Sequence, residues 1–133
     1  MRTVTVETRV RVEFVDVTHH LEAELTASGA RSGVLVAYVP HTTAGVTINE
    51  NADPSVCRDL ITALGRLVPA DLPFAHAEGN ADAHVKASLL GSSVTIPVED
   101  GRLLLGTWQG VYLAEFDGPR RRRLLIRVVD GGR

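Results

Sequence analysis

The sequence has 133 residues, enough for one domain with a hydrophobic core and too few for two independent ones. Hydrophobic residues make up 44% and charged residues 23%, values close to globular averages that argue against a disordered or fibrous chain. The formal net charge of −2 argues against a general nucleic-acid binder, whose domain normally carries a basic excess.

Apolar runs and the single cysteine bear on location and redox chemistry. The longest apolar runs, such as residues 34–39, are far shorter than the ~20 residues that span a bilayer, so no membrane partner is expected. The first residues lack the apolar segment of a secretory signal, so we expect a cytoplasmic protein. Cys57 cannot form an intrachain disulfide, and its apolar neighbours favour a buried, inert thiol.

The first elements follow from residue periodicity. Apolar residues occupy five of the six even positions of residues 4–14, a period of two that predicts one half-buried strand. Asp16 or Thr18 can then cap a short amphipathic helix, which ends at Ser28-Gly29. Residues 33–40 are almost wholly apolar and predict a strand covered on both faces.

The middle of the chain predicts a short strand followed by two helices. Residues 45–49 form the strand, and a helix begins at Pro54 after the candidate cap Asp53 and stops before Pro69. We expect this helix to pack on a sheet. Residues 69–80 form a loop, after which Asn80 can cap a helix over residues 81–90.

The last third is rich in β-forming residues. Four segments predict strands, at residues 94–98, 102–105, 111–116 and 124–129, and Asp100-Gly101 is a strong hairpin signal. The resulting order is strand, helix, two strands, two helices and four strands. The sequence therefore predicts one compact α+β domain over residues 1–133, with a mostly antiparallel sheet and about three helices.

Polar residues gather at the end of the second predicted strand. Residues 40–44 and 47–53 are more polar than strand or helix formation requires. Helix capping can account for Asn51 or Asp53, but it does not account for Asn49 and Glu50. Polar groups at a strand end often converge on a ligand, so Glu50 is the preferred acid or metal-ordering residue.

A second polar segment, residues 76–86, surrounds the start of the last predicted helix. The backbone amides after Asn80 can hold a phosphate, with Lys86 or His84 adding positive charge and Gly79 permitting close approach of the backbone. The alternative is that Asn80 only caps the helix and that Lys86, the one lysine, is solvated.

Three histidines and one glutamine complete the candidate residues. His41, His76 and His84 together can supply three imidazoles to one divalent metal, although their spacing follows no local motif. Gln109 can face a cavity, whereas the neighbouring Trp108 is expected to anchor the core. Glu115 lies in an otherwise apolar strand. Its side chain, like that of Gln109, can face a cavity or lie on a solvent-exposed face of the sheet.

Taken together, four strings resemble the YjbQ family (UPF0047): residues 41–44, 47–54, 78–84 and 106–110. The resemblance covers essentially the whole chain. It implies a compact α+β fold, a homotrimer with a pocket near the subunit boundary, and secondary thiamine-phosphate synthase activity. Phe74 stands where relatives often have tyrosine.

Motif by motif, the resemblance and the polar segments give one candidate site. His41, Glu50 and His84 are the candidate catalytic residues, and His41, His76 and His84 are the candidate metal ligands. The candidate substrate-binding residues are Thr42, Asn49, Asn51, Glu78, Gly79, Asn80, Lys86 and Gln109.

Three functions are open at this stage. The first is a transferase that joins a hydroxymethylpyrimidine diphosphate to a thiazole phosphate, with a divalent ion (Zn or Mg) ordered by Glu50 or Glu78 and His84 protonating the leaving oxygen. The second is a histidine-ligated metal-dependent hydrolase or lyase. The third is a non-catalytic phosphometabolite-binding homotrimer, with the basic residues 120–123 at the trimer contact or near the ligand.

Overall fold

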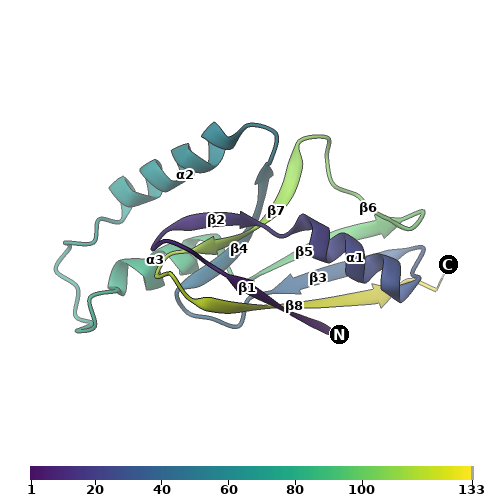
Figure 1. Ribbon diagram of the computed structural model, residues 1–133, viewed down its shortest axis with the longest axis horizontal. Coiled ribbons are helices and arrows are strands. Elements are labelled where there is room, and N and C mark those ends of the chain that lie inside the picture. Colours follow the sequence, from purple (N-terminus) through teal and green to yellow (C-terminus); the bar gives the residue numbers. More distant parts are fainter. Residues whose placement is uncertain (133) are drawn as a thin grey trace.

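Two antiparallel sheets form the frame of the computed structural model, which describes residues 1–132 (Figure 1). The five-stranded sheet has the order β1 (Arg2–Glu7), β8 (Arg121–Asp130), β3 (Gly33–Tyr38), β5 (Ser93–Glu99) and β6 (Arg102–Leu103). The three-stranded sheet has the order β2 (Glu13–Asp16), β7 (Gln109–Glu115) and β4 (Ala44–Glu50).

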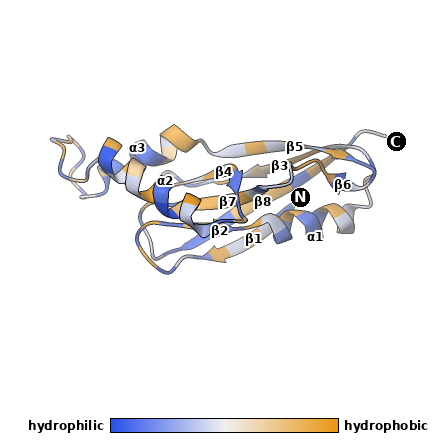
Figure 2. Cartoon of the chain, turned by 90° about the horizontal axis from the view of Figure 1, so that it is seen from above, coloured by the Kyte–Doolittle hydropathy of each residue, from blue (hydrophilic) through white to orange (hydrophobic). Residues whose placement is uncertain are grey.

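Three helices accompany the sheets: α1 (Thr18–Ser28), α2 (Pro54–Leu67) and α3 (Ala81–Leu90). Both views place α3 at one end of the molecule and α1 toward the other (Figures 1 and 2). The predicted α+β class, with three helices and mostly antiparallel strands, is confirmed. None of the helices within residues 1–132 has the length and apolar character needed to cross a bilayer.

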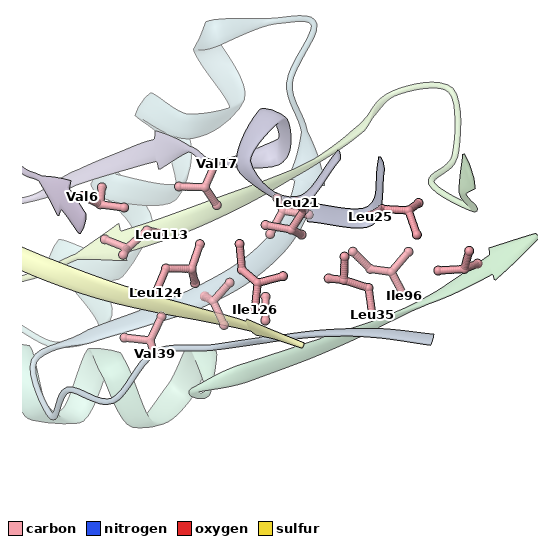
Figure 3. Packing of buried hydrophobic residues seen from close by; sticks show 14 of the residues in the cluster. Val6, Val17, Leu21, Leu25, Leu35, Val39, Ile96, Leu113, Leu124 and Ile126 are labelled. Carbon is pink, nitrogen blue, oxygen red and sulfur yellow. The ribbon is translucent and has the colours of Figure 1, made fainter. Parts of the chain in front are cut away.

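The main core lies where the inner faces of the two sheets and α1 meet (Figure 3). The alternation of β-strands sends every second side chain inward, so Leu124 and Ile126 of β8 and Leu113 of β7 are fully buried. Leu21 and Leu25, four residues apart on α1, close the same core. Burying each such side chain contributes about 1.5–3 kcal/mol.

A second cluster covers the outer face of the three-stranded sheet. Ala83 and Ala87 of α3 contact Ala114 and Phe116, and Leu64 of α2 packs against this cluster. The small alanine side chains let α3 approach β4 closely. The outer sheet face is therefore where α3 is anchored, and this contact positions the histidine on α3 described below.

Residues 4–14 do not form the single strand that their alternation predicts. β1 ends at Glu7 and β2 begins at Glu13, and the two strands belong to different sheets. The residues between them cross from one sheet to the other, held by the hydrogen bond from the Gly118 amide to the Arg11 carbonyl. An alternating pattern cannot reveal such a crossover, because the alternation of apolar and polar residues continues on both sides of it.

Turn and capping signals are confirmed in part. Asp100 and Gly101 have φ of 52° and 72° and join β5 to β6 as the predicted hairpin. Asp53 caps α2 by accepting the Ser55 amide at 2.9 Å. Asn80 precedes α3 but makes no side-chain cap. Cys57 is partly exposed, so the prediction of a buried thiol was wrong.

Candidate functional site

One pocket of about 360 Å³ collects side chains from three separate segments. The loop between β3 and β4 supplies His41, the start of α3 supplies His84, and the turn into β8 supplies Arg120. The other lining residues are Pro40, Thr42, Thr43, Glu78, Asn80 and Arg122. The structure thus brings together five of the predicted site residues: His41, Thr42, Glu78, Asn80 and His84.

His41 is held by a backbone donor. Its Nε2 accepts the amide N–H of Arg123 at 2.9 Å. Partial burial lowers the pKa of His41, and the positive charges of Arg122 and Arg123 lower it further. The imidazole is therefore neutral at physiological pH. Because Nε2 is an acceptor here, it is not free to ligate a metal in this arrangement.

His84 lies between two neighbouring pockets. On one side it lines the pocket shared with His41, and on the other it meets His76 in an apolar pocket of about 350 Å³ that also contains Phe74. The His76 and His84 rings are 5.1 Å apart and edge to face. His84 is thus the one candidate residue that touches both a polar and an apolar cavity within residues 1–132.

The predicted three-histidine metal site does not form among residues 1–132. No group of three histidine, cysteine, aspartate or glutamate side chains converges there in a geometry that could hold an ion. Glu78 Oε2 is 3.7 Å from His76 Nε2, but both side chains are well exposed and the pair is loose.

Asn80 and Arg120, which both line the pocket, are linked through Asp117. The Asn80 amide Nδ2 donates to Asp117 Oδ2 at 2.8 Å, while its Oδ1, the atom that would cap α3, accepts no hydrogen bond. Arg120 donates to the same carboxylate oxygen at 2.9 Å. Burial raises the pKa of Asp117, but these two donors outweigh it and the pKa lies below its usual value.

Asn80 Oδ1 is the one buried side-chain polar atom without a partner among the described residues. An unsatisfied buried acceptor costs about 1–3 kcal/mol, so such atoms are uncommon in native proteins. Asn80 is one of the residues that line the pocket. A ligand with a hydrogen-bond donor, or a water molecule, would satisfy this atom.

A buried ion pair joins Arg122, which lines the pocket, to Glu115. Arg122 Nε donates to Glu115 Oε1 at 2.8 Å, and Arg122 Nη2 donates to Glu115 Oε2 and to Thr43 Oγ1. Thr8 Oγ1 and the Asp117 amide also donate to the carboxylate. Burial alone raises the pKa of Glu115, but these donors outweigh it, so the carboxylate stays ionised.

The sequence interpretation left Glu115 open and grouped Arg122 with a general basic run. The apolar strands around them held the missing signal. Glu115 ends β7, whose residues 110–115 are all buried, and Arg122 has the parity of buried Leu124 on β8. An acid and a base at core positions of consecutive strands are expected to pair.

Lys86 lies outside the pocket. Its Nζ donates to Asp82 Oδ2 at 3.1 Å, and both side chains are almost fully buried. Asp82 also accepts from Arg11 at 3.0 Å. Neither the predicted phosphate contact nor the solvated alternative describes Lys86, whose charge is already paired with the carboxylate four residues earlier.

Gly79 lies in the turn before α3. It has φ of 78°, a left-handed conformation that favours glycine, and a side chain at this position would meet open space. Glycine is therefore required by the backbone turn before α3.

The remaining candidates lie at the opposite end of β4 from His41. Glu50 pairs with Gln109 at one end of the strand, whereas Ala44, beside the pocket, pairs with Glu115 at the other. A strand rises about 3.3 Å per residue, so the seven residues of β4 span roughly 20 Å. Glu50 therefore cannot act on a ligand in the His41 pocket of the same chain.

The far end of β4 has a polar groove of its own. Asn51 and Gln109 line a pocket of about 400 Å³ together with Glu22 and Arg102. Asn49 Oδ1 accepts the adjacent Glu50 amide at 2.7 Å. Trp108 is 62% exposed beside this groove, so the expectation that it anchors the core was wrong. The candidate residues thus form two groups within one chain.

The comparisons with known proteins agree with this fold. A family model described as "UPF0047 protein YjbQ-like" matches residues 2–131. The chain belongs to the UPF0047 YjbQ-like family. A UPF0047 protein of Methanocaldococcus jannaschii is 52% identical over 124 residues, which cover 93% of this chain and 90% of that relative. The UPF0047 protein YugU of Bacillus subtilis is 46% identical over 130 residues, which cover 97% and 98%.

Solved structures of the family share the same architecture. A YjbQ/UPF0047 protein from Clostridium acetobutylicum has a TM-score of 0.96 and 45% identity, covering 97% of this chain and 100% of that chain. A YbjQ-like protein of unknown function from Sulfolobus solfataricus has a TM-score of 0.94 and 31% identity, covering 97% and 95%. The resemblance seen in the motifs is confirmed at the level of the family, whose function is unknown.

Proposed function

We propose that the chain binds a small phosphorylated metabolite in the pocket between His41 and His84, and that His84 donates a proton to the departing phosphate. The observation that carries this proposal is the convergence of two imidazoles and Arg120 on one pocket at the start of α3. A guanidinium and the amides of a helix start both favour a bound anion. An imidazole beside that anion is suited to general acid catalysis.

Thiamine-phosphate synthesis is the specific reaction that the family resemblance offers. In that reaction the C–O bond to the diphosphate breaks, the electron pair leaves with the oxygen, and His84 supplies a proton to it. The thiazole nitrogen then forms the new C–N bond with the pyrimidine methylene. Glu78 lies in the pocket and takes the ion-ordering role that the distant Glu50 cannot fill.

A homotrimer is the proposed assembly. The outer face of the five-stranded sheet exposes apolar side chains, with Tyr38 44% and Val129 50% accessible, and Val36 and Leu125 line a shallow apolar pocket there. Contiguous apolar surface of this kind marks interaction sites. Light scattering that gives three times the chain mass supports a trimer, and the mass of a monomer refutes it. We also propose that the protein is cytoplasmic.

A metal-dependent hydrolase or lyase is the second candidate, and it requires His76, His84 and Glu78, which are neighbours but do not converge on one ion position, to rearrange around a metal. A Zn²⁺ ion there would polarise a bound water. Elemental analysis of protein purified without chelators separates the two candidates. Stoichiometric zinc that is lost in a His76→Ala variant favours the hydrolase.

The test of the primary proposal is a screen of phosphorylated metabolites by mass spectrometry, which includes the pyrimidine diphosphate and thiazole phosphate pair. Wild type is compared with His84→Gln and with His19→Gln, a matched change at an exposed histidine of α1. General acid catalysis is worth about 10²–10⁴-fold, so His84→Gln should lose product formation by that factor. Equal turnover in all three proteins contradicts the role of His84.

A further inference from the structure

The His41 imidazole replaces a missing strand partner. β3 ends at Tyr38, opposite Leu125, so a continued strand would place Pro40 opposite Arg123. The chain turns into a loop there, and the Arg123 amide donates to His41 Nε2 instead. A nitrogen that accepts a hydrogen bond carries no proton. The neutral ring therefore has its proton on Nδ1.

The loop that carries His41 is fastened two residues further on. Arg122 Nη2 donates to the Thr43 hydroxyl at 2.8 Å and to the Thr43 carbonyl at 3.3 Å. Arg122 and Thr43 are only 4% and 6% exposed. Two consecutive residues of β8 therefore hold this loop. Arg123 binds the His41 ring through its amide, and Arg122 binds Thr43 through its side chain.

Glu115 fixes the orientation of Arg122. The carboxylate is 0% exposed and receives both Nε and Nη2 of the guanidinium. A planar guanidinium that donates two hydrogen bonds to one carboxylate has a single orientation, which a lysine or an arginine with one such bond lacks. The Thr8 hydroxyl, at 2.8 Å, and the Asp117 amide, at 3.0 Å, hold the carboxylate itself.

His41 Nδ1 is left facing outward. It has no hydrogen-bond partner within residues 1–132. The only buried polar side-chain atom without a partner in that range is Asn80 Oδ1, so His41 Nδ1 is not buried. The N–H is therefore accessible. His41 lines both the pocket with Arg120 and an adjoining pocket with Ser88. A donor in this place is suited to contact an anion rather than to remove a proton.

We propose that Glu115, acting through Arg122 and Thr43, is a positioning residue that fixes His41 in the Nδ1–H tautomer. His41 in turn donates a hydrogen bond to an anion in the pocket and acts neither as a base nor as an Nε2 metal ligand. The donor half of this inference rests on the proposed function, because it needs the anion. The tautomer half concerns the free protein alone.

The test is a long-range ¹H–¹⁵N NMR spectrum of protein labelled at the histidine nitrogens, with His41 assigned by a His41→Gln variant. Wild type should show one His41 tautomer, protonated at Nδ1. Glu115→Gln should release the loop and give a mixture with the Nε2–H form. Thr43→Val removes only the hydroxyl acceptor and should give a smaller change of the same kind if Glu115→Gln fails to fold. Thr95→Val, at an exposed threonine of β5, is the matched control.

Inorganic phosphate is the probe for the donor role. Its addition to wild type should shift the His41 Nδ1 resonance and the His84 resonances together. An Nε2–H tautomer in wild type overturns the inference, as does an unchanged tautomer in every folded variant. Phosphate that shifts His84 alone overturns only the donor role of His41. Phosphate that shifts neither imidazole overturns the donor role and the proposed function together.

Discussion

Arg122 and Glu115 form an ion pair that is almost fully withdrawn from solvent, with side-chain exposures of 5% and 0%. The pair joins β8 to β7 across the gap between the two sheets, immediately below the pocket that holds His41. Transfer of both charges out of water is costly, so such a pair gives little net stability against an apolar replacement. Its structural value lies in orienting the loop above it.

Removal of one member of this pair should be far more harmful than removal of both. Glu115→Leu alone, or Arg122→Met alone, leaves the other charge buried without a partner and should lower the free energy of unfolding by about 3–5 kcal/mol. The double change Glu115→Leu with Arg122→Met should cost less than the sum of the single changes. Urea denaturation of the four proteins forms a double-mutant cycle, and strictly additive losses contradict the coupling.

Acid should weaken the fold through Asp82. Burial raises the pKa of Asp82, but the hydrogen bond from Lys86 and the charge of Arg11 outweigh it, and the folded-state pKa lies below its ordinary value. The stabilisation is therefore fully present above the unfolded pKa of about 3.9 and is lost as the pH falls through the folded pKa. Asp82→Asn should be less stable at pH 7 and should lose less stability on acidification.

The measurement is the urea unfolding free energy of wild type and Asp82→Asn between neutral pH and about pH 3. Glu115 and Asp117 also have lowered pKa values and contribute acid sensitivity to both proteins. The difference between the two curves isolates Asp82. Parallel curves over the whole range would show that Asp82 contributes nothing to the pH dependence.

His41 should remain uncharged to a lower pH than a free histidine. Partial burial, then Arg122 and Arg123, lower its pKa from the usual value of about 6.5. Because the unfolded state binds this proton more readily, the His41 contribution to stability falls as the pH drops below that value. An NMR titration of the His41 ring protons checks the shift. A midpoint at or above 6.5 contradicts it.

The exposed tryptophan and the buried phenylalanine offer a direct contrast. Phe116 is 0% exposed and fills the cluster between α3 and the three-stranded sheet, so Phe116→Ala should cost about 3–5 kcal/mol. Trp108 is 62% exposed, and Trp108→Ala should change the unfolding free energy by no more than about 0.5 kcal/mol. Thermal and urea unfolding compare the two. A large loss for Trp108→Ala shows that a partner covers it.

The elements were largely predictable from the sequence because helices and strands depend on local periodicity and caps. Asp53 with Pro54, and Gly29 at φ 71°, mark helix ends through interactions within a few residues. The crossover between β1 and β2 was not predictable in this way. Nothing local distinguishes one long alternating strand from two strands that belong to different sheets.

The candidate site was predicted in part for a related reason. The start of α3 and the loop around His41 are distant in sequence, and their motifs did mark the pocket. Asn49 and Glu50 follow His41 closely in sequence, yet an extended strand carries them away from it. Closeness in sequence implies closeness in space across a turn or along one helix face, but not from end to end of a strand.

Gly45 tests whether the contact between α3 and β4 positions His84. A side chain at Gly45 would lie 2.7 Å from the Gly91 carbonyl oxygen and 3.4 Å from Leu90 Cβ, at the end of α3. Backbone cannot yield as a flexible side chain does, so Gly45→Ala should push α3 off the sheet and cost about 1–3 kcal/mol. The displaced helix carries His84 away from His41.

The matched control is Gly65→Ala, since Gly65 lies in α2 and a side chain there meets nothing within 4 Å. That change should stabilise the protein by about 0.5–1 kcal/mol, because alanine favours the helix. Calorimetry with inorganic phosphate then separates stability from positioning. Gly45→Ala should bind phosphate more weakly than wild type at a temperature where both are folded, whereas Gly65→Ala should bind it equally. Unchanged phosphate affinity in folded Gly45→Ala would show that phosphate binding in the pocket does not depend on the packing of α3 against β4.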